Sequence, residues 1–126
     1  MIKAKTLFVI DDDAIYQLIT QKELEQHGPH ITCKNYYNGA SALQALQELP
    51  EPPAIILLDL NMPIMDGWEF LEAYQQLPTS LTQHIQLYVV SSSIDYRDID
   101  RAKENPLVSD FIIKPITSTN FSQILQ

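Results

Sequence analysis

Short apolar runs alternate with segments of helical periodicity along the chain, and this alternation restricts the fold more than any other feature of the sequence. Five runs are predicted to be strands, at residues 7–10, 31–36, 54–58, 85–90 and 110–113. Neighbouring parallel strands need a crossover connection, which is usually a helix. The pattern therefore predicts an α/β domain with a doubly wound, five-stranded parallel sheet and helices on both faces. The second run is the more polar and should lie nearer an edge.

The segments between the strands carry apolar residues three or four positions apart, as amphipathic helices do. These residues are Ile15, Leu18 and Ile19; Ala42, Leu43, Leu46 and Leu49; Phe70, Leu71 and Tyr74; and Phe121, Ile124 and Leu125. Gly28 should end a first helix over residues 14–27, and Asn38 should cap the second. Ser92 and Ser93, with Asp95 after them, should cap a helix over residues 95–104.

Composition limits the partners and the compartment. The 126 residues suit one domain, which we expect to span residues 1–126. The net charge of −8 opposes the phosphate backbone of nucleic acid, and no apolar stretch approaches the roughly 20 residues of a membrane span. The single cysteine, Cys33, has no disulfide partner, and the first residues do not resemble a secretory signal. We expect a cytoplasmic protein that binds neither nucleic acid nor membrane.

Polar side chains stand at the ends of four predicted strands. Asp11 and Asp12 follow the first strand, Asp59 follows the third, Ser91 the fourth and Lys114 the fifth. The carboxyl ends of parallel strands meet at one edge of the sheet, where ligands bind in doubly wound folds. Three converging carboxylates repel one another unless a divalent cation with oxygen ligands lies between them. The pattern predicts a Mg²⁺ site, with Mn²⁺ as a substitute.

The same residue types suit phosphoryl transfer. A carboxylate beside a metal ion can attack phosphorus and form an acyl phosphate. The ammonium of Lys114 and the hydroxyl of Ser91 can each bind an oxygen of the transferred group. Asp59 is the strongest candidate for the nucleophile, because an acid that ends the apolar run Ile-Ile-Leu-Leu is poorly solvated unless it has a task.

Each of these residues taken alone also has a purely structural interpretation. Paired aspartates commonly precede a helix, where negative charge complements the helix dipole. Ser91 alone would more often be a helix cap than a ligand, and Phe111 at the start of a strand would more often be part of the core. The coincidence of two acids, a third acid, a hydroxyl and a lysine at four strand ends favours the functional interpretation.

Four motifs at these strand ends resemble the response-regulator receiver family of two-component signalling. They are Phe-Val-Ile-Asp-Asp-Asp at 8–13, Leu-Leu-Asp-Leu-Asn-Met-Pro-Ile-Met-Asp-Gly at 57–67, Val-Val-Ser-Ser at 89–92 and Phe-Ile-Ile-Lys-Pro at 111–115. The resemblance covers the whole chain and its second motif is highly specific. It implies the flavodoxin-like strand order 2-1-3-4-5 and a phosphorylation-switched module, similar to single-domain chemotaxis regulators, without an output domain in this chain.

The resemblance implies a phosphoacceptor rather than a turnover enzyme. Asp59 would accept the phosphoryl group from a histidine kinase or a phosphotransfer protein, and the chain would assist only its own phosphorylation and dephosphorylation. Asp59 and Asp12 would bind the metal directly. Asp11 would act through a water molecule, and Asn61 would contribute its backbone carbonyl.

The resemblance further implies a switch. Ser91 and Phe111 would move together on phosphorylation, and Lys114 would bind the phosphoryl group and form a cis peptide bond with Pro115. Residues 62–67 would form a loop beneath the site, and the glycine that ends this loop would adopt backbone angles that other residues avoid.

The chain departs from the family pattern near its fifth strand. Val108 and Ser109 replace a common Gly-Ala pair, Asn105 and Pro106 precede them, and the last helix is short. In the family this region usually contacts the partner, so the downstream protein is left open. We expect a monomer or a weak dimer.

Two other functions fit part of the pattern. A haloacid-dehalogenase-type phosphatase also uses an aspartate nucleophile and Mg²⁺, but it needs a second acid two residues later, where this chain has Asn61. A phosphorylation-independent binding module would keep the fold without the switch. Acetyl phosphate separates the three, because a receiver is labelled on Asp59 and loses the label slowly, a phosphatase turns over and a passive module does neither.

Overall fold

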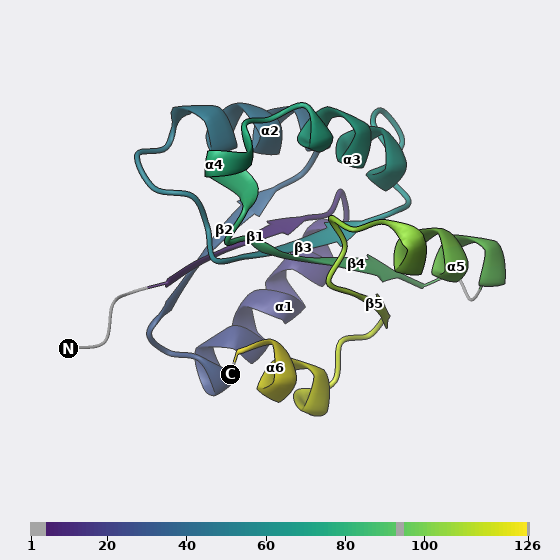
Figure 1. Cartoon of the computed structure of the whole chain (residues 1–126). Coiled ribbons are helices and arrows are strands. Elements are labelled where there is room, and N and C mark those ends of the chain that lie inside the picture. The colour runs from purple at the N-terminus through teal and green to yellow at the C-terminus, as the bar shows by residue number, and fades with distance from the viewer. Residues whose placement is uncertain (1–4, 93–94, 126) are drawn as a thin grey trace.

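A computed structural model of the chain describes residues 5–92 and 95–125 (Figure 1). The five strands are parallel and form one sheet in the order β2-β1-β3-β4-β5. They are β1 (Lys5–Ile10), β2 (Ile31–Tyr36), β3 (Ile55–Asp59), β4 (Gln86–Ser91) and β5 (Asp110–Ile113). The predicted fold class and strand order are confirmed, and so is the edge position of residues 31–36.

Helices cover both faces of the sheet. They are α1 (Ala14–His27), α2 (Gly39–Glu48), α3 (Gly67–Gln75), α4 (Thr79–Thr82), α5 (Tyr96–Glu104) and α6 (Ser118–Ile124). In Figure 1, α1 and α6 lie below the sheet, α2, α3 and α4 lie above it, and α5 lies near β5. The pattern of apolar residues did not predict the one-turn helix α4, which is too short to show a period. In the part of the chain that the structure describes, no helix is long and apolar enough to cross a membrane.

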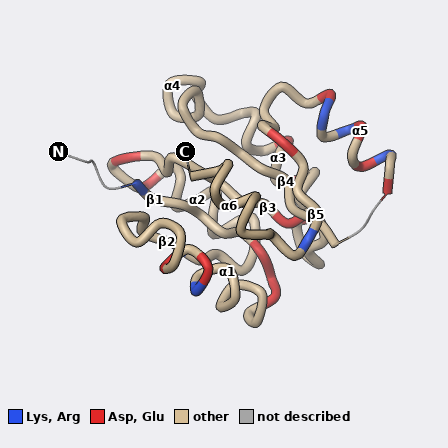
Figure 2. The backbone as a smooth tube through the Cα atoms, turned by 90° about the horizontal axis from the view of Figure 1, so that it is seen from below, with Lys and Arg blue, Asp and Glu red and all other residues tan. Residues whose placement is uncertain are grey.

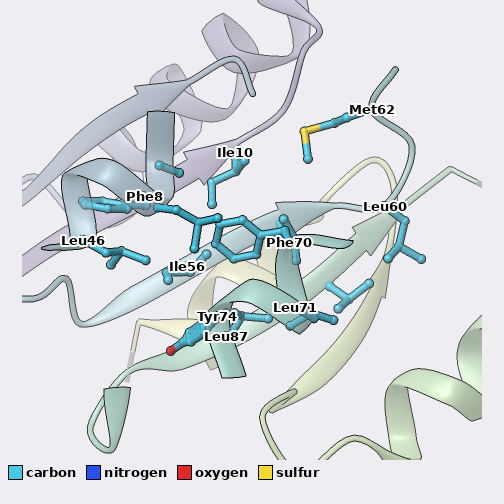
Figure 3. Close-up of a cluster of buried hydrophobic side chains, with 14 residues drawn as sticks. Phe8, Ile10, Leu46, Ile56, Leu60, Met62, Phe70, Leu71, Tyr74 and Leu87 are labelled. Carbon is cyan, nitrogen blue, oxygen red and sulfur yellow. The ribbon is translucent and has the colours of Figure 1, made fainter. Parts of the chain in front are cut away.

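Alternate residues of the central strands supply two apolar cores, one on each face. Phe8 and Ile10 of β1 belong to the core beneath α2 and α3, which Figure 3 shows around Phe70. Leu7 and Val9 of the same strand belong to the core beneath α1 and α6. Because β1 and β3 are covered on both faces, their sequences are almost continuously apolar, as is typical of parallel sheets.

Side-chain caps begin all the described helices except α4, and one cap differs from the prediction. Asn38 caps α2 as expected, accepting a hydrogen bond from the backbone N–H of Ser41 at 2.8 Å. The cap of α5 is Asp95, which accepts from the N–H of Arg97. Ser92 is described but is not the cap, and Ser93 lies outside the described residues. A carboxylate at this position also complements the helix dipole.

The predicted packing face of α1 is wrong. Ile15, Leu18 and Ile19 are 73%, 54% and 51% exposed, whereas Gln17, Thr20 and Leu24 are buried against the sheet. The bounds of this helix match the prediction, but its rotation about its own axis does not. Hydrogen bonds of the Gln17 side chain, described below, supply the physical reason.

Candidate functional site

Three carboxylates gather at the carboxyl edge of the sheet. Asp11 and Asp12 directly follow β1, and Asp59 is the last residue of β3. Because Ile10 and Leu58 are paired in register, the two strands end at the same level. One oxygen from each acid lies within 4.8 Å of those of the others, and Asp11 and Asp59 are buried while Asp12 is exposed. Such a donor set, half buried and rich in oxygen, fits a divalent cation.

Lys114 completes this group from the end of β5. Its Nζ lies 2.7 Å from Asp11 Oδ2 and 3.6 Å from Asp59 Oδ1. The backbone N–H of Lys114 donates to the carbonyl of Ser91, and the Lys114–Pro115 peptide bond is cis, as the motif implied. Figure 2 shows the blue segment that follows β5 on the same side of the molecule as the red segments at the ends of β1 and β3.

Burial and mutual repulsion change the proton affinity of the site. The pKa of Asp59 is raised from 3.8 to about 6, first by burial and then by the negative charge of Asp11, while the charge of Lys114 opposes the rise. For Lys114, burial acts to lower the pKa, but the hydrogen bond to Asp11 and the charge of Asp59 outweigh it and raise the pKa. The lysine is therefore charged at neutral pH, and a cation would relieve the remaining repulsion.

Ser91 connects to the phosphoacceptor candidate through Asn61. Ser91 is fully buried at the end of β4, and its Oγ accepts a hydrogen bond from Asn61 Nδ2 at 3.2 Å. The backbone N–H of Asn61 donates to Asp59 Oδ1 at 3.3 Å. The structure thus brings Ser91, Asn61 and Asp59 together, through the side-chain and backbone N–H groups of Asn61. Phe111, one strand away, is half-buried against the core beneath α3 and pairs in register with Val89.

Gly67 is required for a reason other than the predicted one. None of the described glycines has a positive φ, so Gly67 does not adopt a conformation denied to other residues. A Cβ atom at this position would lie 2.8 Å from the Cα of Leu60 and 2.9 Å from the carbonyl oxygen of Asp59. The glycine therefore allows the start of α3 to approach the backbone of Asp59 closely.

A cleft of about 600 Å³ opens beside the carboxylates. Its lining is formed by Asp12, Leu60, Asn61, Met62, Pro63, Asp66, Trp68 and Asp98. Trp68 Nε1 donates to Asp98 Oδ1 at 3.3 Å, and the guanidinium of Arg101 lies 4.2 Å from the centre of the Trp68 ring. Trp68 lies in the first turn of α3 and connects this helix to α5.

Two residues of α1 contact the site although no motif pointed to them. Gln17 is 1% exposed, and its Nε2 lies 3.0 to 3.1 Å from the carbonyl oxygens of Val9, Asp11 and Tyr36. Asn35 of β2 donates to the Gln17 side-chain oxygen. These bonds orient the backbone that carries the acids after β1.

Tyr16 is the second such residue. Its ring lies under the ammonium of Lys114, with Nζ 4.2 Å from the ring centroid. Polar and aromatic residues in the first turns of a helix are common, so nothing in the sequence distinguished either residue.

Comparison with known proteins agrees with this geometry. A model of the response regulator receiver domain matches residues 7–126 of the chain. The chain belongs to this family. The likeness to receiver domains therefore extends from the strand-end motifs to nearly the whole chain.

Relatives of the receiver domain occur in proteins of very different length. The chain is 36% identical over 77 residues to the response regulator receiver protein CpdR of Brucella abortus, and the match covers 61% of each protein. It is 29% identical over 94 residues to probable histidine kinase 5 of Oryza sativa, which covers 75% of this chain and 8% of the kinase. The matched segment is thus less than two-thirds of the length of these curated relatives.

Solved structures match over nearly the full chain. A two component response regulator from Cytophaga hutchinsonii has a TM-score of 0.90 at 25% identity and covers 98% of this chain and 96% of its own. A response regulator receiver protein from Dyadobacter fermentans has a TM-score of 0.86 at 28% identity, with 95% and 94% covered. These structures support the fold and the family.

Proposed function

We propose that this receiver domain accepts a phosphoryl group on Asp59 from a histidine kinase or a phosphotransfer protein and that the label changes a protein-interaction surface. The observation that carries the proposal is the position of Asp59. It is a buried carboxylate at a strand end, within reach of two further acids and of the Lys114 ammonium. A charged nucleophile in such surroundings is stable only if it has a cation beside it.

A divalent cation, Mg²⁺ or Mn²⁺, is part of the proposal. Asp11, Asp12 and Asp59 would bind it, together with the backbone carbonyl of Asn61 that the family resemblance implies. The donor set consists of hard oxygen ligands, which Mg²⁺ prefers, and it contains no histidine or cysteine. Mg²⁺, when bound, neutralises the carboxylates and polarises an oxygen of the phosphoryl group.

The chain's own residues carry the transfer step. An ionised Asp59 oxygen attacks the phosphorus of a phosphohistidine in line with the leaving nitrogen. The new P–O bond forms as the P–N bond breaks, and the imidazole nitrogen leaves with the electron pair. Lys114 neutralises charge on an equatorial oxygen. The protein is both the substrate and half of the catalyst, and water later hydrolyses the acyl phosphate slowly.

Ser91 and Phe111 would form the switch. In the structure, the Ser91 hydroxyl accepts from Asn61, whose backbone N–H also donates to Asp59. The Ser91 O–H could donate to a phosphoryl oxygen on Asp59, and a hydrogen bond to a charged oxygen is stronger than one to a neutral oxygen. Movement of Ser91 toward that oxygen would let the half-buried ring of Phe111 turn inward, which changes the surface near β5. We propose that a cytoplasmic partner protein reads this surface.

Acetyl phosphate tests the proposal directly. The protein with Mg²⁺ should gain about 80 Da, the mass of one phosphoryl group, and lose it slowly. The variant Asp59→Asn should gain nothing, and the matched variant Asp100→Asn, on the exposed side of α5, should behave as the wild type. Continuous release of phosphate would instead support the phosphatase, and the absence of both label and turnover would support a passive binding module.

A further inference from the structure

Tyr16 contacts both sides of the loop that carries Lys114. From the first turn of α1, its ring lies beneath the Lys114 ammonium, with 4.2 Å between Nζ and the ring centroid. Its hydroxyl oxygen accepts a hydrogen bond from the backbone N–H of Ile116 at 3.3 Å. These two contacts lie on either side of Pro115. A single half-buried side chain therefore binds the charged end of the lysine and the backbone beyond it.

The position of the ammonium needs such support because two acids compete for it. Nζ lies 2.7 Å from one oxygen of Asp11 and 3.6 Å from one oxygen of Asp59. A long lysine side chain has many rotamers, and restricting it costs entropy. The face of an aromatic ring attracts a cation through its quadrupole and leaves the donor hydrogens free for oxygen ligands. The ring can thus orient the ammonium without occupying its hydrogen bonds.

We propose that Tyr16 is a positioning residue for Lys114: its ring restrains the ammonium between Asp11 and Asp59, and its hydroxyl fixes the backbone after the lysine. Tyr16 does not touch the reacting atoms and acts only through Lys114. The inference deepens the proposed function and rests on it, because the lysine has a phosphoryl oxygen to bind only if Asp59 is the acceptor. The geometry itself can be tested without phosphorylation.

Ring currents give that independent test. Nζ of Lys114 lies over the Tyr16 ring, so the NMR signals of the protons on the adjoining Cε should be shifted upfield of those of Lys22, an exposed lysine on α1. The shift should disappear in Tyr16→Leu and persist in Tyr16→Phe. Unshifted Lys114 signals in the wild-type protein would contradict the inference whether or not Asp59 is phosphorylated.

The kinetic test uses the rate of labelling by acetyl phosphate in the presence of Mg²⁺. Tyr16→Leu should slow labelling about 3- to 30-fold, which is what the loss of a partly buried cation–π contact predicts. Tyr16→Phe keeps the ring and should lose less than about threefold. Tyr96→Leu, which removes a 75% exposed tyrosine from α5, should match the wild type. Should Tyr16→Leu fail to fold, Tyr16→Met fills similar space without an aromatic face and is expected to slow labelling equally.

The same substitution made in a Lys114→Met variant shows whether Tyr16 acts through the lysine. In Lys114→Met, labelling should already be slow, and adding Tyr16→Leu should change it by less than about twofold, because coupled residues are not additive. An equal slowing by Tyr16→Leu in both backgrounds would reduce Tyr16 to a structural role and overturn the inference. So would a Tyr16→Leu variant that is labelled at the wild-type rate. A wild-type protein that gains no mass contradicts the proposed function instead.

Discussion

Lys114 lies closer to Asp11 than to Asp59, with Nζ–O distances of 2.7 and 3.6 Å. The lysine is thus bonded to the acid after β1 and lies within charge-pairing distance of Asp59 at the end of β3. A phosphoryl group on Asp59 would offer it further charged oxygens. The lysine is therefore placed to move a short way between partners as the site changes its charge.

Removing that charge should slow phosphorylation and raise the proton affinity of the acceptor. We expect Lys114→Met to reduce the rate of labelling by acetyl phosphate roughly 100-fold, as for the loss of one donor that stabilises transition-state charge. Because the charge of Lys114 lowers the pKa of Asp59, that pKa should also rise above its present value of about 6. Lys103→Met, an exposed lysine on α5, is the matched control and should change neither quantity.

Asp59 should lower the stability of the metal-free protein at neutral pH. Its pKa is about 6 in the folded protein against 3.8 for the ordinary carboxyl. Well below pH 3.8 the group is protonated in both states and changes nothing. As the pH rises from 3.8 to 6, the unfolded chain releases its proton first, so the free energy of unfolding falls. The fall is about 3 kcal/mol once the pH exceeds 6.

Urea denaturation without metal checks this linkage. Asp59→Asn should be more stable than the wild type at pH 7 by a few kcal/mol, and the difference should vanish below pH 4. Asp100→Asn should show no comparable gain at either pH. Added Mg²⁺ should stabilise the wild type at pH 7 and have little effect on Asp59→Asn. A difference that grew as the pH fell would have the wrong sign for this explanation.

For two neighbouring residues of α1, replacing the polar one should cost more unfolding free energy than replacing the apolar one. Gln17→Leu removes a donor to the carbonyl oxygens of Val9 and Asp11, in two buried hydrogen bonds, and should cost about 1 to 3 kcal/mol of unfolding free energy. Leu18→Gln changes a side chain that is 54% exposed and should remain within about 0.5 kcal/mol of the wild type. Thermal or urea unfolding of the two variants compares them directly. The reverse order would mean that α1 packs through its apolar side after all.

Gly67 should not tolerate a methyl group. In Gly67→Ala, the Cβ would meet backbone atoms of Leu60 and Asp59 at under 3 Å, so the start of α3 must move. We expect a loss of about 1 to 3 kcal/mol and slower labelling of Asp59. Gly39→Ala is the control, because its Cβ would meet side-chain and not backbone atoms: Met65 Sδ at 2.7 Å, in a flexible side chain that can turn away, and Phe70 Cδ2 at 3.2 Å. A similar cost at both positions would contradict this comparison.

The strands and the set of site residues could be predicted from the sequence because both are local or topological properties. Residues 31–36 and 110–113 are strands with the predicted bounds, since each is a run of strand-forming residues between turn signals. Parallel pairing then forces the ends of β1, β3, β4 and β5 to one edge. Asp59, Ser91 and Lys114 therefore had to lie near one another, however far apart they are in the chain.

Only the tertiary structure decided which side of α1 packs, why Gly67 is needed and what surrounds Lys114. The apolar period of α1 favoured Ile15, Leu18 and Ile19, but the buried Gln17 side chain donates to carbonyl oxygens near the ends of β1 and β2. Buried carbonyls require partners that are set by distant strands. No periodicity in the sequence reports such a requirement. The same holds for Tyr16, whose contacts with Lys114 and Ile116 join residues about 100 positions apart.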